Sequence, residues 1–210
     1  MPDLLAWLEG TDRWLFLLIN RAGQNSLFDL VMPVLSEKRY ALIPGAGLIA
    51  LIGWRGGRRA WVWLAAAGLA LALSDGTANL LKHLFSRIRP CHVVGGVHLL
   101  GGCTHSFAMP SNHAGNMAAL ATVAWLGCPR WGWLLGILAG LVGYSRIYLG
   151  VHYPADVLGG FALGVAGAWL AVRGVGTLLP RFFTTPQESS GSSAGTTSNP
   201  VNPDPPESRQ

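Results

Sequence analysis

The sequence predicts an all-α integral membrane protein, a helix bundle of five to six transmembrane helices. Half of its 210 residues are hydrophobic and only 12% are charged, whereas soluble domains carry about 25% charged residues. The chain also contains several long uncharged stretches, and about 20 helical residues are enough to cross a hydrocarbon core roughly 30 Å thick. These observations together favour one multi-pass membrane domain over a soluble fold.

Five uncharged stretches are the candidate spans, and each can be extended to full length: 41–54, 60–74, 114–128, 131–145 and 157–172. Extending the second stretch to Leu81 adds only Asp75 as a charge. Ionisable residues inside a span usually face the protein interior. Asn79 lies one turn beyond Asp75, so we expect both on one helix face inside the bundle.

The two ends of the chain differ from this core. Residues 1–25 predict a helix that lies in the membrane interface or crosses the membrane, and 27–35 can begin a further span, so five and six crossings both stay open. We expect no cleaved signal peptide. Residues 26–180 form the predicted transmembrane domain, and 184–210 are rich in Ser, Thr, Pro and Gly. Such a tail buries too little apolar surface to fold, so we expect disorder.

Orientation is predicted from the basic loops, because short cytoplasmic loops collect Lys and Arg. Six arginines fall on one side of the predicted bundle: Arg55, Arg58, Arg59, Arg130, Arg173 and Arg181. That side and the tail are therefore expected in the cytoplasm, and the segments 82–110 and 145–156 outside. The same loops account for most of the net charge of +5. No Arg-rich face with interleaved aromatics is present, so nucleic acid is not an expected partner.

Cys91 and Cys103 both fall in the outward-facing segment. An oxidising exterior permits a disulfide between them, and two unpaired thiols are the alternative. A zinc site including His92, His98 and His105 is conceivable by residue type, but the spacing matches no familiar zinc module.

Three clusters of ionisable and polar residues map to the outward-facing side. The first is Lys82, six residues, then Arg89-Pro90, and the second is Pro110-Ser111-Asn112-His113. The third is Ser145-Arg146, five residues, then His152, with Asp156 four residues later. A chance gathering of so many reactive residue types on one face is improbable, so we interpret the clusters as one site.

These residue types suit chemistry on a phosphate ester. Transfer of a phosphoryl group depends mainly on positioning and on stabilising the charge of its oxygens, which Lys82, Arg89 and Arg146 supply. Ser111 and the backbone N–H groups near Asn112 lie at a predicted helix start, where anions bind favourably.

A nucleophile and an acid are also present. A neutral imidazole can attack phosphorus when a carboxylate orients it, and His152 and Asp156 have the spacing to meet, although Pro154 indicates a helix beginning between them. His113 then protonates the leaving oxygen.

The three clusters resemble the signature of the type 2 phosphatidic acid phosphatase (PAP2) family, which reads Lys-x6-Arg-Pro, Pro-Ser-Gly-His and Ser-Arg-x5-His-x3-Asp. The first and third parts match in full, and Asn112 replaces Gly in the second. The resemblance spans about residues 26–173. Because the family uses a backbone N–H at the position of Asn112, Asn still donates, while its added bulk is expected to alter substrate preference.

The resemblance implies a role for each residue at the outer membrane face. His152 forms a phosphohistidine, Asp156 orients it, His113 protonates the leaving group, and the phosphate is held by Lys82, Arg89, Ser111, Asn112 and Arg146. It implies no metal and no other cofactor. Arg87, at an unspecified position of the first motif, is expected to anchor the chain at the interface rather than touch the substrate headgroup.

The expected function is therefore hydrolysis of a lipid phosphate or diphosphate in a bacterial inner membrane, with the site facing the periplasm. The small size and short loops resemble undecaprenyl-diphosphate phosphatases, with phosphatidic acid and phosphatidylglycerophosphate as competing substrates. Two alternatives remain open, a phosphotransferase that passes phosphate to lipid A and a non-catalytic lipid binder.

Overall fold

The computed structural model describes residues 2–183, and the predicted disordered tail at 184–210 lies outside them. Every regular element in the described part is helical, which confirms the predicted all-α class. In chain order these are α1 (Pro2–Leu17), a π-helix η1 (Leu18–Ala22), α2 (Ser26–Ser36), α3 (Lys38–Phe85), α4 (Pro90–Val93), α5 (Asn112–Gly127), α6 (Pro129–Tyr148), α7 (Pro154–Leu178) and a 3-10 turn η2 (Pro180–Phe182).

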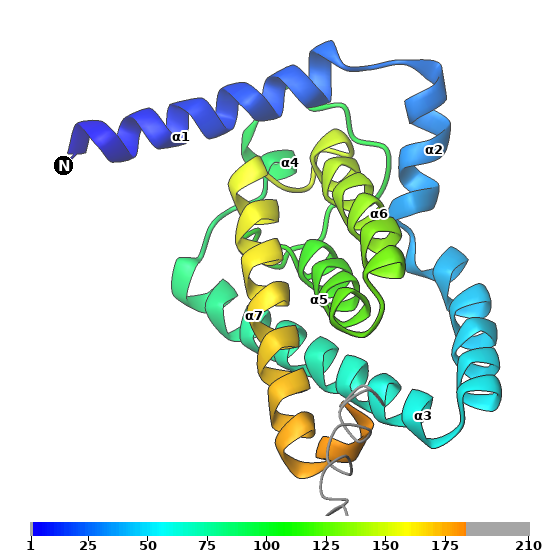
Figure 1. The fold of residues 1–210 in the computed structure, drawn as a ribbon. Coiled ribbons are helices and arrows are strands. Elements are labelled where there is room, and N and C mark those ends of the chain that lie inside the picture. Colours follow the sequence, from blue (N-terminus) through cyan, green and yellow to red (C-terminus); the bar gives the residue numbers. More distant parts are fainter. Residues whose placement is uncertain (1, 184–210) are drawn as a thin grey trace, which may run out of the picture.

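Helix α3 consists of two limbs that meet at a sharp turn, visible in Figure 1. Gly57 has φ 56° and ψ −151° at this turn, a backbone conformation open almost only to glycine. The predicted stretches 41–54 and 60–74 lie on either side of it. The two expected spans are therefore present as helices, joined by a kink at glycine instead of a separate loop.

Helix α5 lies at the centre of the bundle and packs against α3, α6 and α7 (Figure 1). Its contact with α7 is so close that two glycines are required. A Cβ added at Gly164 would lie 2.1 Å from the carbonyl oxygen of Gly115, and one added at Gly160 would lie 2.4 Å from that of Ser111. Small residues permit this backbone approach between membrane helices, and here it draws the start of α5 onto the start of α7.

The outer surface of the bundle is apolar. Along α7, for example, Leu158, Leu170 and Leu178 are all more than half exposed, as expected of side chains that face lipid. Two helical ranges have the length and apolarity of a membrane span, Gly45–Val93, which includes the turn at Gly57, and Pro154–Leu178. Helix α5 has 16 residues, about 24 Å of rise, and is short for a span.

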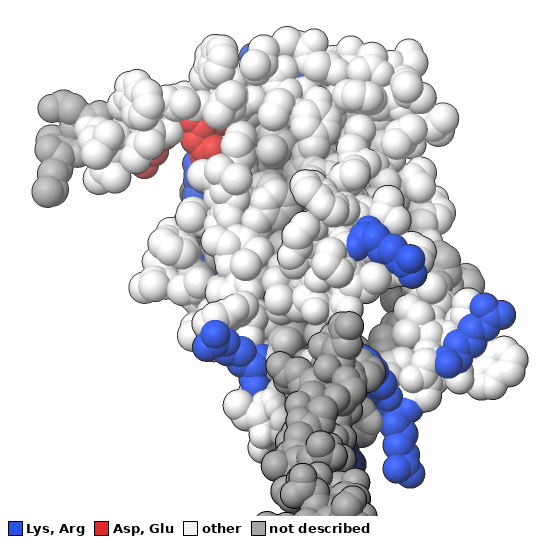
Figure 2. All heavy atoms as spheres, viewed as in Figure 1, with Lys and Arg blue, Asp and Glu red and all other residues white. Residues whose placement is uncertain are grey.

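Charge is distributed unevenly along the bundle. Figure 2 shows most of the visible Lys and Arg side chains at its lower end, where α7 ends and α3 turns, whereas the visible acidic side chains lie beside α1. Helix α1 extends away from the opposite end, close to where α7 begins (Figure 1). Asn20 ties its base to the bundle, because its fully buried amide donates to the carbonyl oxygens of Tyr148 at 2.7 Å and His98 at 2.9 Å.

Candidate active site

The start of α7 is a capped helix end that brings His152 and Asp156 together. Tyr153 is the N-cap residue, Pro154 opens the helix and Asp156 is the third helical residue. The Asp156 carboxylate accepts the Tyr153 backbone N–H at 2.8 Å, the usual way an acidic residue satisfies a free N–H at a helix start. The approach of His152 and Asp156 therefore comes from a capping turn and not from two positions within one helix.

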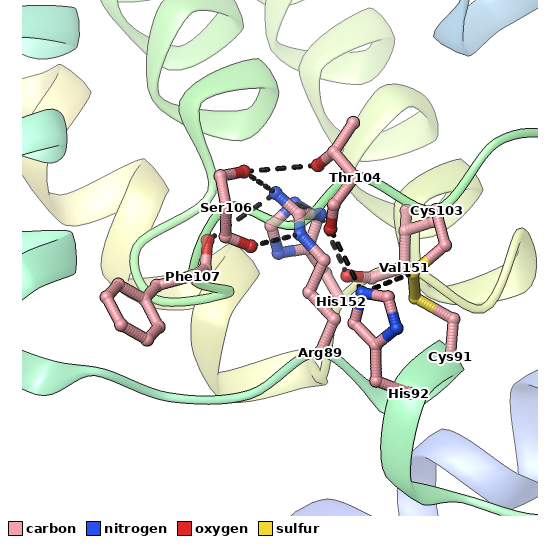
Figure 3. Close-up of a disulfide and its surroundings, with 9 residues drawn as sticks. All are labelled: Arg89, Cys91, His92, Cys103, Thr104, Ser106, Phe107, Val151 and His152. Carbon is pink, nitrogen blue, oxygen red and sulfur yellow. Dashed lines mark hydrogen bonds between the residues drawn. A yellow bond between two sulfur atoms is a disulfide. The ribbon is translucent and has the colours of Figure 1, made fainter.

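His152 is 2% exposed and lies between a carboxylate and a guanidinium. Its Nδ1 is 3.5 Å from Asp156 Oδ2, and Arg89 Nη1 donates to its Nε2 at 3.1 Å (Figure 3). A guanidinium can only donate, so Nε2 must accept with its lone pair. The ring proton is then on Nδ1, facing Asp156, so the hydrogen bond from Arg89 fixes the tautomer.

The surroundings of His152 also favour the neutral ring. Burial lowers its pKa from 6.5 to about 4, the Asp156 carboxylate opposes this shift, and the cations Arg89 and Arg146 add to it. At neutral pH the imidazole is therefore uncharged with a free lone pair on Nε2, which is the form that a nucleophile needs.

Lys82 and Arg89 are buried cations held by one loop. Lys82 Nζ donates to the carbonyl oxygens of Phe107 at 3.0 Å and Pro110 at 2.8 Å. Arg89 donates from Nε to the Ser106 carbonyl at 2.7 Å and from Nη2 to the Ser106 hydroxyl at 2.9 Å (Figure 3). Loop 106–110 thus holds both cations in place, and Arg89 contacts His152.

The second motif forms the start of α5. Ser111 is fully buried at the N-cap position, and its hydroxyl has no hydrogen-bond partner among residues 2–183. Its backbone N–H donates to the Asp156 carbonyl at 2.9 Å, which joins this motif to the third. His113 follows in the first turn and is half-buried.

The side chain of Asn112 is turned toward α3. Its amide donates to Asp75 Oδ1 at 2.8 Å and to Asn79 Oδ1 at 3.2 Å. Asn116, one turn further along α5, donates to the same Asp75 oxygen at 3.0 Å. Asp75 and Asn79 therefore share a helix face, as expected, and together they accommodate the bulk that Asn112 adds.

Arg146 lies in the last turn of α6 and is oriented toward α2. Its Nη1 donates to the Ser36 hydroxyl, and its buried Nε has no partner within the described residues. It lines a cavity of about 140 Å³ whose other walls are Pro33, Ser36, Glu37, Leu100, Gly101, Gly102, Leu149 and Val151. The structure thus places Arg146 at the edge of the cationic cluster.

Comparison with known proteins decides the family. The model of the PAP2 superfamily matches residues 63–179, more than half of the chain and all three motifs. The chain belongs to the PAP2 superfamily. The membership expected from the motifs is confirmed, and the protein is a PAP2-type phosphatase, a phosphoric ester hydrolase of the membrane.

Three similar proteins place this PAP2 chain within its family. A Sulfolobus acidocaldarius protein named undecaprenyl-diphosphatase is 32% identical over 162 residues, which are 76% of each chain. The crystal structure of Aquifex aeolicus LpxE superposes with a TM-score of 0.65 at 29% identity, covering 76% of this chain and 93% of that one. A transmembrane PAP2-type phosphatidylglycerolphosphate phosphatase from Bacillus subtilis superposes with a TM-score of 0.61 at 26% identity, covering 83% and 89%.

The PAP2 site also contains residues that the sequence did not reveal. Arg87 donates to Asp156 at 2.8 Å and to Asp12 at 2.5 Å, although an anchoring role was expected for it. Ser106 binds Arg89, and Ser36 binds Arg146. The only signal for Arg87 was its place two residues before the motif arginine, and nothing in the spacing identified Asp12, Ser36 or Ser106.

Cys91 and Cys103 form a disulfide, with their Cα atoms 6.3 Å apart (Figure 3). Of the three arrangements that the sequence left open, the structure contains this one. His92 Nε2 lies 3.2 Å from Cys103 Sγ, so the three side chains are close enough to share a metal ion. Metal binding would require thiolates, and the bonded sulfurs are not available for it.

Proposed function

We propose that this PAP2 phosphatase hydrolyses undecaprenyl diphosphate to undecaprenyl phosphate and phosphate, through a phosphohistidine on His152. The observation that carries the proposal is the hydrogen bond from Arg89 Nη1 to His152 Nε2. It leaves a neutral imidazole with Nε2 as the basic atom and Nδ1–H directed at Asp156, as nucleophilic attack on phosphorus requires.

In the first step His152 Nε2 forms a bond to the terminal phosphorus, and the bond from phosphorus to the bridging oxygen breaks. His113, as the imidazolium, gives its proton to that leaving oxygen. Asp156 holds the Nδ1 proton and stabilises the positive charge that develops on the ring of His152. Arg89 transfers its Nη1 hydrogen bond from the ring to a phosphate oxygen when the substrate binds.

The other phosphate ligands approach from three sides. Lys82 uses two of its three N–H donors on loop carbonyls, which leaves one for phosphate. The buried Ser111 hydroxyl and the backbone N–H groups at Asn112 face the anion from the start of α5. Arg146 supplies the remaining charge from α6, so the oxygens are stabilised as negative charge shifts during transfer.

In the second step water completes the hydrolysis. His113, now neutral, takes a proton from a water molecule, whose oxygen attacks phosphorus as the bond to His152 Nε2 breaks. Phosphate leaves, and His152 and His113 return to their starting states. No step in this scheme needs a metal ion or another cofactor.

The proposal places the site on the outer face of a bacterial inner membrane. The cationic end seen in Figure 2 corresponds to the turn at Gly57, the start of α6 and the end of α7, and cytoplasmic ends collect arginine. The loop between α6 and α7 carries His152, and the first turn of α7 carries Asp156, at the opposite end. The limbs of α3 together with α5, α6 and α7 supply five crossings of domain 26–180, α2 supplies a sixth membrane-inserted segment, and α1 lies along the interface.

The identity of the lipid rests on the similarity to the Sulfolobus acidocaldarius undecaprenyl-diphosphatase, which covers three quarters of both chains. The similarity to the phosphatidylglycerolphosphate phosphatase of Bacillus subtilis supports phosphatidylglycerophosphate as a second candidate substrate. The two differ in the leaving group, which is a phosphate for the first and an alkoxide for the second.

Phosphate release by the purified full-length protein in nanodiscs tests this assignment. Undecaprenyl diphosphate, phosphatidic acid, phosphatidylglycerophosphate and lipid A are offered separately, in ¹⁸O-labelled water and with no acceptor lipid. We expect the highest kcat/KM with undecaprenyl diphosphate and one ¹⁸O atom in each released phosphate. A higher kcat/KM with another lipid contradicts the substrate assignment, and absence of phosphate release without an acceptor contradicts hydrolysis in favour of phosphotransfer.

A further inference from the structure

We propose that Arg87 and Asp12 are positioning residues for the nucleophile, with Asp12 bringing the N-terminal helix α1 into the catalytic unit. This inference rests on the proposed role of His152 and Asp156. Arg87 occupies one of the six unspecified positions of the first motif, and α1 lies outside the part of the chain that matches the family.

Arg87 fixes the orientation of the Asp156 carboxylate. Asp156 Oδ2 accepts from the Tyr153 backbone N–H and faces the ring of His152, whereas Oδ1 accepts from Arg87 Nη1 at 2.8 Å. A carboxylate held through only one oxygen can rotate about its terminal torsion. With both oxygens bound, its plane is fixed, and Oδ2 stays directed at the Nδ1 proton of His152.

Arg87 is itself held on two further sides. Its Nη2 donates to Asp12 Oδ2 at 2.5 Å, and its guanidinium carbon lies 4.2 Å from the centre of the Tyr153 ring. Asp12 is 9% exposed, and its second oxygen accepts the backbone N–H of Ala155 at 2.8 Å. Asp12 thus connects α1 both to Arg87 and to the first turn of α7.

The order of these contacts is Asp12, Arg87, Asp156, His152. These four residues lie in α1, in the loop after α3, in the first turn of α7 and in the loop between α6 and α7. In Figure 1 the base of α1 lies beside the start of α7, as these contacts require. Residues that hold a functional group through a second hydrogen bond commonly change activity by about 10- to 100-fold when they are replaced.

Because Arg87 is positively charged and Asp12 negatively charged, replacing each by a neutral residue is expected to shift the pKa of His152 in opposite directions. Three charged groups act directly on His152, namely Arg89 after α3, Arg146 on α6 and Asp156 on α7. Lys82 on α3 and Arg87 after it act in turn on Asp156. Replacing Arg87 by a neutral residue removes positive charge and raises the pKa of His152. Replacing Asp12 removes the negative charge that balances Arg87 and lowers the pKa of His152.

The experiment measures kcat, KM and the pH profile of kcat/KM for the full-length protein in nanodiscs, with Arg87→Gln, Arg87→Lys and Asp12→Asn. We expect Arg87→Gln to lower kcat by roughly 10- to 100-fold with KM changed less than about threefold. The acid limb of kcat/KM moves up by about 0.5–1 pH unit in Arg87→Gln and down by a similar amount in Asp12→Asn. Arg87→Lys, which keeps the charge and one donor, recovers part of kcat.

Two matched controls lie on the same helix as Asp12. Glu9→Gln removes a negative charge one turn away, and Arg13→Gln removes an exposed positive charge next to Asp12. Neither side chain makes a hydrogen bond or ion pair with any other residue in 2–183. Both controls are expected to keep kcat within about twofold. In the double variant Asp12→Asn/Arg87→Gln, loss of Asp12 should add no further decrease in kcat, because Asp12 acts through Arg87.

Four results would overturn the proposal: kcat within twofold of the parent in Arg87→Gln, an effect confined to KM, an acid limb that moves in the same direction in both single variants, or additive losses in the double variant. Should Arg87→Gln fail to fold, Asp12→Asn alone still gives the direction of the shift. If His152→Ala also retains activity, the result contradicts the proposed role of His152 as nucleophile and does not bear on the positioning roles of Arg87 and Asp12.

Discussion

Asp156→Asn replaces one oxygen of a fully buried carboxylate with an amide nitrogen and leaves the side-chain volume almost unchanged. Asp156 accepts two hydrogen bonds, from Tyr153 N–H and from Arg87, both at 2.8 Å, and faces His152 Nδ1 at 3.5 Å. An asparagine has one acceptor oxygen and two amide N–H donors. Whichever way it turns, its amide nitrogen faces either Arg87 or the Tyr153 and His152 side, and all of these groups donate.

The magnitude follows from what the amide loses. One charge-assisted hydrogen bond is replaced by a contact between two donors, which costs about 1.5–3 kcal/mol. The imidazole also loses the negative charge that stabilises it as positive charge develops, and we assign about 2 kcal/mol to this in a partly screened site. Together these amount to about 3–5 kcal/mol in the transition state, so kcat is expected to fall by roughly 10²–10⁴-fold.

The assay is single-turnover formation of the phosphohistidine by rapid quench, with thermal unfolding measured on the same preparation. Asp29→Asn is the matched control. Asp29 also pairs with a histidine, His98, at 2.8 Å and accepts from Tyr148, but it lies on α2 and away from the nucleophile. We expect Asp29→Asn to keep kcat within about threefold, because partly exposed ion pairs contribute little to stability. A folded Asp156→Asn protein that forms phosphohistidine within fivefold of the parent rate would refute the reasoning.

Three further changes have expected outcomes. The pKa of His152 is lowered from 6.5 to about 4, so the unfolded chain binds a proton at a higher pH than the folded protein does. The free energy of unfolding should therefore fall by up to about 3 kcal/mol as the pH drops from 6.5 to 4. If the free energy of unfolding depends on pH equally in the parent and in His152→Gln, this prediction is contradicted. Gly164→Ala should destabilise the protein, because its Cβ would meet a backbone oxygen of α5, whereas Gly174→Ala in the same helix has nothing within 4 Å and should stabilise it by about 0.5–1 kcal/mol. Thermal unfolding measures both changes in stability, and two changes of the same sign would contradict the packing argument. Asn112→Gly should lose the hydrogen bonds to α3 and with them about 1.5–3 kcal/mol of stability. Its kcat should change less than about threefold, because the backbone N–H remains. Unchanged stability with a tenfold loss of kcat would show that the side chain acts on the phosphate instead.

The sequence predicted those contacts within the candidate site that local spacing determines. Lys82 lies in the last turn of α3, and Arg89 caps α4 at the end of the short loop that follows. His152 directly precedes the capping turn that contains Asp156. In each pair the short spacing already limits how far apart the side chains can be. The all-α class followed equally directly, because uncharged stretches of span length have no stable alternative to helices in lipid apart from closed barrels.

Spacing and composition could not predict the contacts between distant segments. Arg87 pairs with Asp12 across 75 residues and with Asp156 across 69, and Arg146 meets Ser36 across 110. Such partners are chosen by helix packing, and many residues of the right type compete for them. For the same reason the sequence left the bond between Cys91 and Cys103 open, since a disulfide depends on Cα positions that spacing does not give.

The role of Asn112 shows how structure changes the interpretation of a departure from a motif. From sequence, an Asn in place of Gly adds bulk at the phosphate. In the structure the added amide is bonded to Asp75 and Asn79 on α3, and Asn116 supplies a second donor to the same carboxylate. The departure is therefore accompanied by partners on two helices, and it connects α5 to α3 beside the site.

Direct detection of the covalent intermediate tests the central claim. The enzyme is mixed with undecaprenyl diphosphate, quenched in alkali within the first turnover, and cleaved after Arg146 and Arg173. The resulting fragment, residues 147–173, contains His152 as its single histidine. We predict one phosphoryl group on this fragment, which forms before phosphate is released and is absent from His152→Ala. Phosphate release with no phosphorylated fragment, or with the label on His113, would contradict the account.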